Sequence, residues 1–94
     1  MTVYVDNAEI AFGRMKMSHM IADTVEELHE MAERIGMRSE WFQASPPSSF
    51  PHYDVSLSKR REAVRLGAVL MNRREIGEKI RELKKARQLQ AIAK

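Results

Sequence analysis

The sequence contains no cysteine, and this absence excludes both a disulfide framework and a thiolate metal site. With four glycines and three prolines among 94 residues, it is neither collagen-like nor of low complexity. No apolar run approaches the roughly 18 residues that a membrane-spanning helix needs. The first residues also lack the basic start and the apolar stretch of a signal peptide. We therefore expect a cytoplasmic protein with no membrane partner.

The composition is that of a single globular domain. Hydrophobic residues make up 44% and charged residues 31% of the chain, which is typical of a folded protein. A chain of 94 residues has room for one hydrophobic core, and it contains no internal repeat. We therefore predict one α/β domain over residues 1–94, with a basic C-terminal helix over residues 73–93.

Charge is distributed unevenly along the chain. Residues 1–57 carry four Lys or Arg against nine Asp or Glu, a net −5, whereas residues 58–94 carry twelve against four, a net +8. The basic half can attract a nucleotide or a nucleic acid. The two halves can equally attract each other, within the fold or between two copies of a homodimer. A host protein bound through the last helix is a third partner that the sequence leaves open.

Hydrophobic patterning and capping signals predict the main elements. Thr24 and Glu27 form a capping box, which predicts a helix that Gly36 ends. A second helix is expected from Ser56 or Ser58 to about residue 66, and the third is the basic helix. Short β-branched or apolar runs predict strands at residues 3–5, 15–22, 53–55 and 68–71. Residues 41–42 are expected in a single helical turn, and residues 44–51 in a Ser/Pro-rich loop.

The order of these elements indicates how the sheet is built. Strands that alternate with helices favour βαβ units, in which neighbouring strands run parallel. We therefore predict an α/β fold with a small, mostly parallel sheet of three or four strands and about three helices.

Several short motifs in fixed order resemble a family of small domains of unknown function from bacterial and bacteriophage genomes. The resemblance covers about residues 2–71. It is carried by Tyr4–Asp6, Met17–Thr24, Glu27–His29, Ile35–Gly36, Trp41–Gln43, His52–Asp54, Leu57–Arg60, Ala63–Val64 and Gly67–Val69. The chain departs from the family at Asn7, where members often have a second Asp, and in a longer loop before His52. The resemblance implies a bacterial or phage origin and supplies no activity.

Four polar residues lie at the ends of predicted strands and are candidates for acid–base chemistry. His19 and His52 could act as a general acid and base, because imidazole titrates near neutral pH. Asp6 or Asp54 could orient one of the two rings. The alternative is structural: Asp6 forms a turn, and His19 bonds to a backbone carbonyl.

The same side chains are also acceptable ligands for Zn²⁺, Mn²⁺ or Fe²⁺. Their spacing matches no metal-binding motif, so we predict no metal site and no cofactor.

A second candidate site lies at the start of the second helix. Ser58, Lys59 and Arg60 would place a hydroxyl, two cations and free backbone N–H groups around one point, which suits a phosphate. Cations in the first turn also oppose the helix dipole, so exchanging Lys59 and Arg60 for glutamate should stabilise the free protein and abolish phosphate binding. The alternative is that nearby acids neutralise them.

These observations favour a phosphate-handling module that binds a nucleotide or a nucleic acid. The first alternative is an enzyme that processes a nucleotide or phosphodiester with the histidine pair, and the second is a protein-interaction module. Trp41 and Phe42 could stack a base, although aromatics in so small a domain are mostly core. The methionines at 15, 17 and 20 are expected to fill the core. The residues alone do not decide whether the protein is an enzyme.

Overall fold

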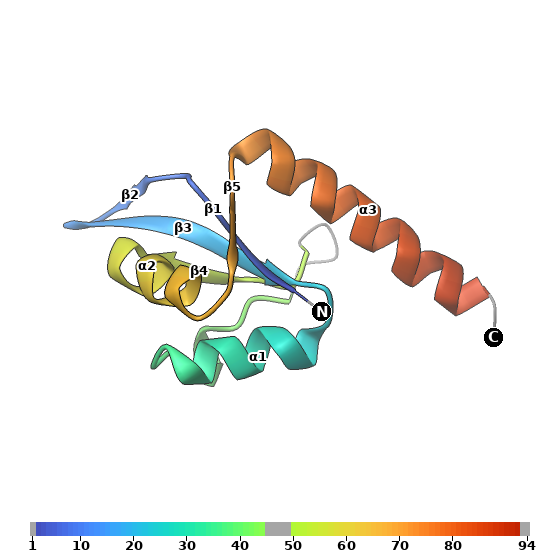
Figure 1. Ribbon diagram of the computed structural model, residues 1–94, viewed down its shortest axis with the longest axis horizontal. Helices are drawn as coiled ribbons and strands as arrows, with labels where there is room; N and C mark the ends of the chain where they lie inside the picture. Colours follow the sequence, from blue (N-terminus) through green and yellow to red (C-terminus); the bar gives the residue numbers. More distant parts are fainter. Residues whose placement is uncertain (1, 45–49, 93–94) are drawn as a thin grey trace.

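A computed structural model describes residues 2–44 and 50–92 (Figure 1). It confirms an α/β fold with three α-helices and shows a five-stranded mixed sheet. The strands are β1 (Val3–Asp6), β2 (Ile10–Phe12), β3 (Met15–Ala22), β4 (Tyr53–Ser56) and β5 (Val69–Met71). The helices are α1 (Val25–Arg34), α2 (Leu57–Arg65) and α3 (Arg73–Ile92), with a short 3-10 turn, η1 (Ser39–Trp41). Of the predicted Ser/Pro loop, residues 45–49 lie outside the described residues.

The mostly parallel sheet predicted from the sequence is wrong. Strand β3 is central and pairs antiparallel with β1, β2 and β4, while only β1 and β5 pair in parallel. The reason lies in the connections. Antiparallel strands can be joined by a two-residue loop, as β2 and β3 are through Gly13 and Arg14. The connection from β3 to β4 contains α1 and the long segment over residues 35–52. This segment takes the chain back across the sheet before β4 begins, so β4 runs antiparallel to β3 rather than parallel to it.

Strand β2 was not predicted, because Asn7 and Gly13 indicated a loop and a strand of three residues is too short to show a hydrophobic period. It forms by pairing with the first half of β3, from Ile10 opposite Met17 to Phe12 opposite Met15. Gly13 opens the hairpin loop at a φ of 61°, a left-handed conformation that glycine adopts without strain. The tight turn therefore creates an additional strand at the sheet edge.

Helix ends follow the predicted capping signals. The Thr24 hydroxyl accepts the backbone N–H of Glu27 at 3.2 Å and donates to the Glu27 carboxylate at 2.8 Å, so Thr24 is the N-cap of α1 and its hydroxyl is held by Glu27. Gly36, at a φ of 79°, follows its last turn. Asn72 and Glu75 form a reciprocal capping box at the start of α3: the Asn72 side chain accepts the Glu75 backbone N–H at 2.8 Å, and the Glu75 carboxylate accepts the Asn72 backbone N–H at 2.9 Å. These caps fix where the helices leave the sheet.

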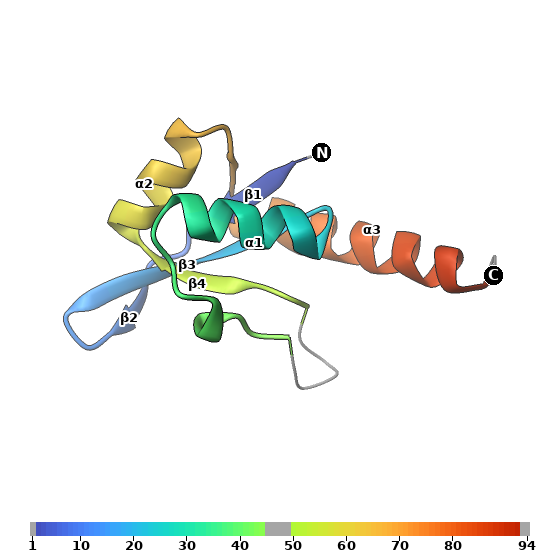
Figure 2. The same ribbon diagram turned by 90° about the horizontal axis from the view of Figure 1, so that it is seen from below.

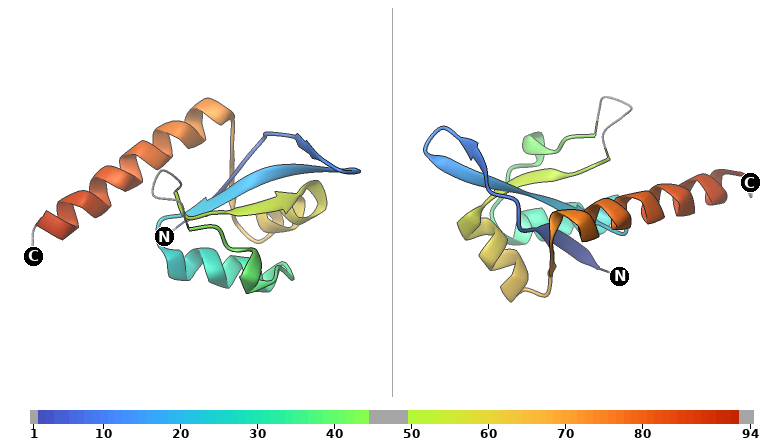
Figure 3. Two further views of the ribbon diagram at one scale, coloured as in Figure 1. Left: turned by 180° about the vertical axis from the view of Figure 1, so that it is seen from behind. Right: turned by 90° about the horizontal axis from the view of Figure 1, so that it is seen from above.

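Apolar side chains fill both faces of the sheet. Helices α1 and α2 cover one face, where Val5, Met20, Leu28, Tyr53 and Val55 belong to the larger core (Figure 2). The first half of α3 covers the other face, over a smaller core of Tyr4, Ile21, Phe50 and Ile76. Helix α3 then continues beyond the sheet and projects from the body (Figure 3). No helix in the described residues is long and apolar enough to cross a membrane.

Candidate functional site

The candidate site is built on an interruption between β1 and β2, which lie along the same edge of β3. Val5 of β1 lies opposite Met20 of β3, and Ile10 of β2 lies opposite Met17. The four residues 6–9 therefore lie opposite only two residues of β3, 18 and 19, so the edge contains two residues more than a regular ladder. This is a bulge, a feature that often re-aims side chains near active sites. Asp6 lies at the start of this bulge, on the sheet face that α3 covers.

The Asp6 carboxylate holds the ring of His19 in place. Asp6 is only 3% exposed. Its Oδ1 accepts the backbone N–H groups of His19 at 2.9 Å and of Ala8 at 3.2 Å, and its Oδ2 lies 2.8 Å from His19 Nδ1. Because an ionised carboxylate only accepts hydrogen bonds, Nδ1 carries the proton of the neutral ring. The outer nitrogen, Nε2, is then free to take up a proton.

The contact shifts the pKa values of both partners. Burial alone would raise the pKa of Asp6, but the hydrogen bonds from the His19 ring and backbone outweigh it, and the pKa lies below its ordinary value. The hydrogen bond to Asp6 raises the pKa of His19 against the opposing effect of burial, and the charge of Asp54 adds to the increase. The pair is therefore ionised over an extended pH range.

Arg60 supports the bulge from the other side. Its Nη1 donates to the Ser18 hydroxyl oxygen at 3.0 Å and to the carbonyl oxygens of Asp6 and Ala8, both at 3.4 Å. The Ser18 hydroxyl in turn donates to the Ala8 carbonyl. Two carbonyl groups of the irregular bulge, those of Asp6 and Ala8, thus have hydrogen-bond donors, which buried polar groups require.

The other two candidates come from β4 and from the residue that precedes it, and they lie at the same place. Asp54 lies directly opposite His19 in the β3–β4 ladder. The Nδ1 atom of His52 donates to the Phe50 carbonyl at 2.7 Å, so its Nε2 is also left free. Both free nitrogens face Asp54 Oδ1, at 3.9 Å from His19 and 3.5 Å from His52, and the ring centroids are 5.7 Å apart. Two imidazoles therefore flank one carboxylate.

Gln43 is a member of this site that was not predicted. It forms an isolated bridge with His52, and its Nε2 donates to Asp54 Oδ2 at 2.8 Å. It immediately follows Trp41 and Phe42 in one of the motifs above, but a glutamine carries no titratable group and so was not selected. Gln43 fixes the orientation of Asp54 between the two rings.

Asp6, His19, His52, Asp54 and Gln43 are together called the proton-transfer array. A hollow of about 230 Å³ opens on the α3 side of this array. Its polar lining comes from Asp6, His19 and His52, and Ile76 of α3 lies among its apolar residues. The charge of Arg73, the first residue of α3, opposes the protonation of His19. A small group entering the hollow would meet both imidazoles.

The second predicted site has a different geometry. The Lys59 ammonium group donates to the carbonyl of Ile35, the last residue before Gly36, at 2.6 Å, and Arg60 is engaged with the bulge. The Ser58 hydroxyl lies 3.2 Å from that of Ser56, which caps α2. Asp6, His19, His52 and Asp54 are brought together, whereas Ser58, Lys59 and Arg60 point to different neighbours.

Within residues 2–44 and 50–92, no group of three or more His, Asp or Glu side chains is arranged to hold a metal ion. The chemistry supported by the array is proton transfer, since it combines an oriented imidazole, a second imidazole and a carboxylate between them.

A family model described as a protein of unknown function, DUF4031, matches residues 3–83. No curated protein and no solved structure matches the chain.

Proposed function

The chain belongs to the DUF4031 family of proteins of unknown function, as its motifs indicated, and we propose from the geometry of the site that it is an acid–base enzyme. The observation that carries this proposal is the arrangement of His19. A buried carboxylate binds one ring nitrogen, the other lies 3.9 Å from Asp54 Oδ1, and the ring lines a hollow together with a second histidine. This is the arrangement by which enzymes orient a general base.

His19 serves as the base. In its neutral form, Nε2 accepts the proton of an attacking water or hydroxyl group while Nδ1 stays bonded to Asp6. Asp6 stabilises the imidazolium that forms, as a carboxylate does beside a catalytic histidine. Asp6 does not reach the reacting atoms itself, so it acts as a positioning residue.

His52 serves as the acid. When its ring is protonated, Nδ1 keeps its bond to the Phe50 carbonyl and Nε2 donates to the leaving group. Asp54 Oδ1 lies 3.5 Å from that nitrogen and marks the side from which the leaving group would be approached.

We propose a phosphodiester, such as that of a nucleotide, as the substrate. A nucleophile that loses its proton to His19 attacks phosphorus, the P–O bond to the leaving group breaks, and the leaving oxygen takes its proton from His52. No oxidant or reductant is required. The positive charge of Arg73, which acts on His19, supports an anionic substrate.

The test is turnover of a panel of dinucleotides and cyclic nucleotides. His19→Gln and His52→Gln should each lower the rate at least about 100-fold, the usual contribution of a general acid or base. His29→Gln is the matched control. It removes the third histidine of the chain, which bonds to the Tyr53 hydroxyl away from the array, and should leave the rate largely unchanged. Turnover that survives both site variants would contradict the proposal.

Nucleic-acid binding without turnover is a second candidate function. It is supported by the charge of the basic half, much of which lies on α3, where Arg81, Lys84 and Lys85 are exposed. The phosphate site at Ser58, Lys59 and Arg60 stays a prediction.

A further inference from the structure

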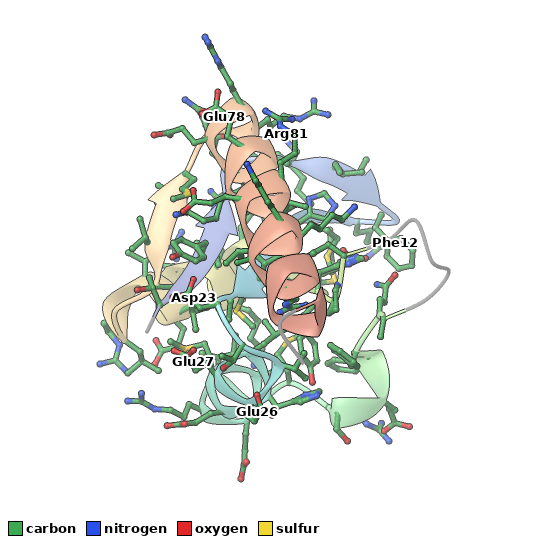
Figure 4. The ribbon with its side chains drawn as sticks, turned by 90° about the vertical axis from the view of Figure 1, so that its right-hand side faces the viewer. Phe12, Asp23, Glu26, Glu27, Glu78 and Arg81 are labelled. Carbon is green, nitrogen blue, oxygen red and sulfur yellow. The ribbon has the colours of Figure 1, made fainter. Side chains whose placement is uncertain are left out.

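A large apolar groove lies beside the proton-transfer array. It has a volume of about 620 Å³, within the range of small-molecule sites. The β2–β3 hairpin contributes one side, including Phe12, which is labelled in Figure 4, and the segment over residues 37–43 contributes the other. Its apolar lining consists of Phe12, Met15, Met17, Met37, Trp41 and Phe42.

Several of these large apolar side chains are exposed to solvent and lie outside the hydrophobic core. Phe12 is 73% exposed, Met15 50% and Trp41 48%, so the expectation that Met15 and Trp41 are core residues is wrong. Phe42 does pack against the core, as expected. Single exposed apolar residues are ordinary, but a group that surrounds a hollow marks a binding surface.

Polar groups line one part of the groove and join it to the array. Gln43 and Asp54 both contribute to its wall. Asp54 is also the residue that both histidines face, at 3.5 and 3.9 Å. A ligand that fills the groove therefore meets first apolar and aromatic surfaces, and then a carboxylate at the edge of the reacting centre.

We infer that the groove binds a planar nitrogen heterocycle that carries N–H donors, the chemical class of the nucleobases. The inference rests on the proposed function and names the recognised part of its substrate. Aromatic rings and methionine thioethers suit the flat face of such a ring. The Asp54 carboxylate accepts the adjacent N–H groups at its edge, since a carboxylate can accept two parallel donors.

Trp41 provides a direct readout, because it is the single tryptophan of the chain and lines the groove. Guanosine, which presents two adjacent N–H donors, should change the tryptophan fluorescence in a saturable way. Caffeine, a planar purine with no N–H donor, should bind at least about tenfold more weakly. Equal affinity for the two compounds would overturn the assignment of a donor-bearing ring.

Two alanine variants test whether guanosine binds in the groove. Phe12→Ala should weaken guanosine binding about tenfold, the usual effect of losing a stacked aromatic. Leu70→Ala is the matched control, because Leu70 is 53% exposed on β5 at the opposite edge of the sheet, and it should have no effect. No response to guanosine, or a response that Phe12→Ala leaves unchanged, would overturn the inference and favour a protein segment or a second copy as occupant.

The same assay separates this inference from the proposed function. His19→Gln should abolish phosphodiester turnover and leave guanosine binding intact. Turnover without guanosine binding would overturn only the groove assignment. Guanosine binding that depends on Phe12, in a wild-type protein without turnover, would overturn only the enzymatic proposal.

Discussion

At the residue scale, Asp6 links the fold to the chemistry. One carboxylate oxygen satisfies two backbone N–H groups at the bulge, and the other binds the His19 ring. The sequence could predict that Asp6 and His19 were strand-end polar residues. It could not predict that they touch, because the contact depends on two additional residues in a ladder whose second strand, β2, is too short to show a hydrophobic period.

The pKa shifts predict how stability depends on pH. Because the pKa of His19 is raised in the folded protein, the contribution of His19 to the free energy of unfolding is complete below the ordinary pKa of histidine, about 6.5. This contribution is lost as the pH rises through the pKa of the folded state. Because the pKa of Asp6 is lowered in the folded protein, the contribution of Asp6 to the free energy of unfolding is present above the ordinary pKa of aspartate, about 3.9. This contribution is lost as the pH falls through the pKa of the folded state. The pair should therefore stabilise the protein most between about pH 4 and 6.5.

Urea unfolding of the wild type and His19→Gln measures this effect. The stability advantage of the wild type should be about 0.5–1 kcal/mol larger near pH 5.5 than near pH 9, a small value because the His19 side chain is 39% exposed. An advantage that is constant with pH, or larger near pH 9, would mean that the ion pair does not form in solution.

At the element scale, the first turn of α2 shows why a correct sequence observation can support more than one conclusion. Lys59 and Arg60 do oppose the dipole of their own helix, as the sequence indicates. Their charged ends reach other elements: Lys59 places its ammonium at the C-terminus of α1, where a cation is favourable, and Arg60 reaches the bulge. The sequence shows that a cation in the first turn is unfavourable within its own helix. It does not show that the side chain finds a hydrogen-bond acceptor 24 or more residues away.

The geometry therefore reverses the expected effect of the glutamate exchange. Lys59→Glu/Arg60→Glu should lower the free energy of unfolding by about 2–5 kcal/mol, because the carbonyl groups that accept from these side chains lose their charged donors. Arg61→Glu, in the same turn and exposed, should change it by less than about 0.5 kcal/mol, since it only improves the match to the helix dipole. Chemical denaturation measures both, and a stabilised double variant would restore the phosphate-site prediction.

At the scale of the whole molecule, the sequence predicted most elements and misplaced some of them relative to one another. The caps of Thr24, Ser56 and Asn72 are local, so the helix starts could be predicted. The direction of β4 depends on how the chain returns over residues 35–52, for which local sequence gives no rule. For the same reason the sequence could select His19 and His52 but could not identify Gln43, which reaches the site only through its bridge with His52.

The uneven charge of the molecule predicts weak, sequence-independent binding of polyanions. Affinity for a single-stranded oligonucleotide should fall steeply with salt as counterions are released. Lys84→Glu/Lys85→Glu on α3 should weaken binding, whereas Arg14→Glu/Lys16→Glu, the same charge change on exposed residues of the acidic half, should weaken it much less. Absence of binding at low salt, or equal losses in the two variants, would exclude the basic half as a nucleic-acid surface.

The central claim is that Asp6 holds His19 as a proton-transfer group, and an NMR titration of the histidine rings tests it most directly. In the wild type, the His19 ring should titrate above about pH 6.5, with the proton of its neutral form on Nδ1. Asp6→Asn should lower the pKa of His19 substantially, and Asp54→Asn should lower it less, because Asp6 makes the largest contribution. A His19 ring that titrates at or below its ordinary value, and does not respond to Asp6→Asn, would contradict the claim.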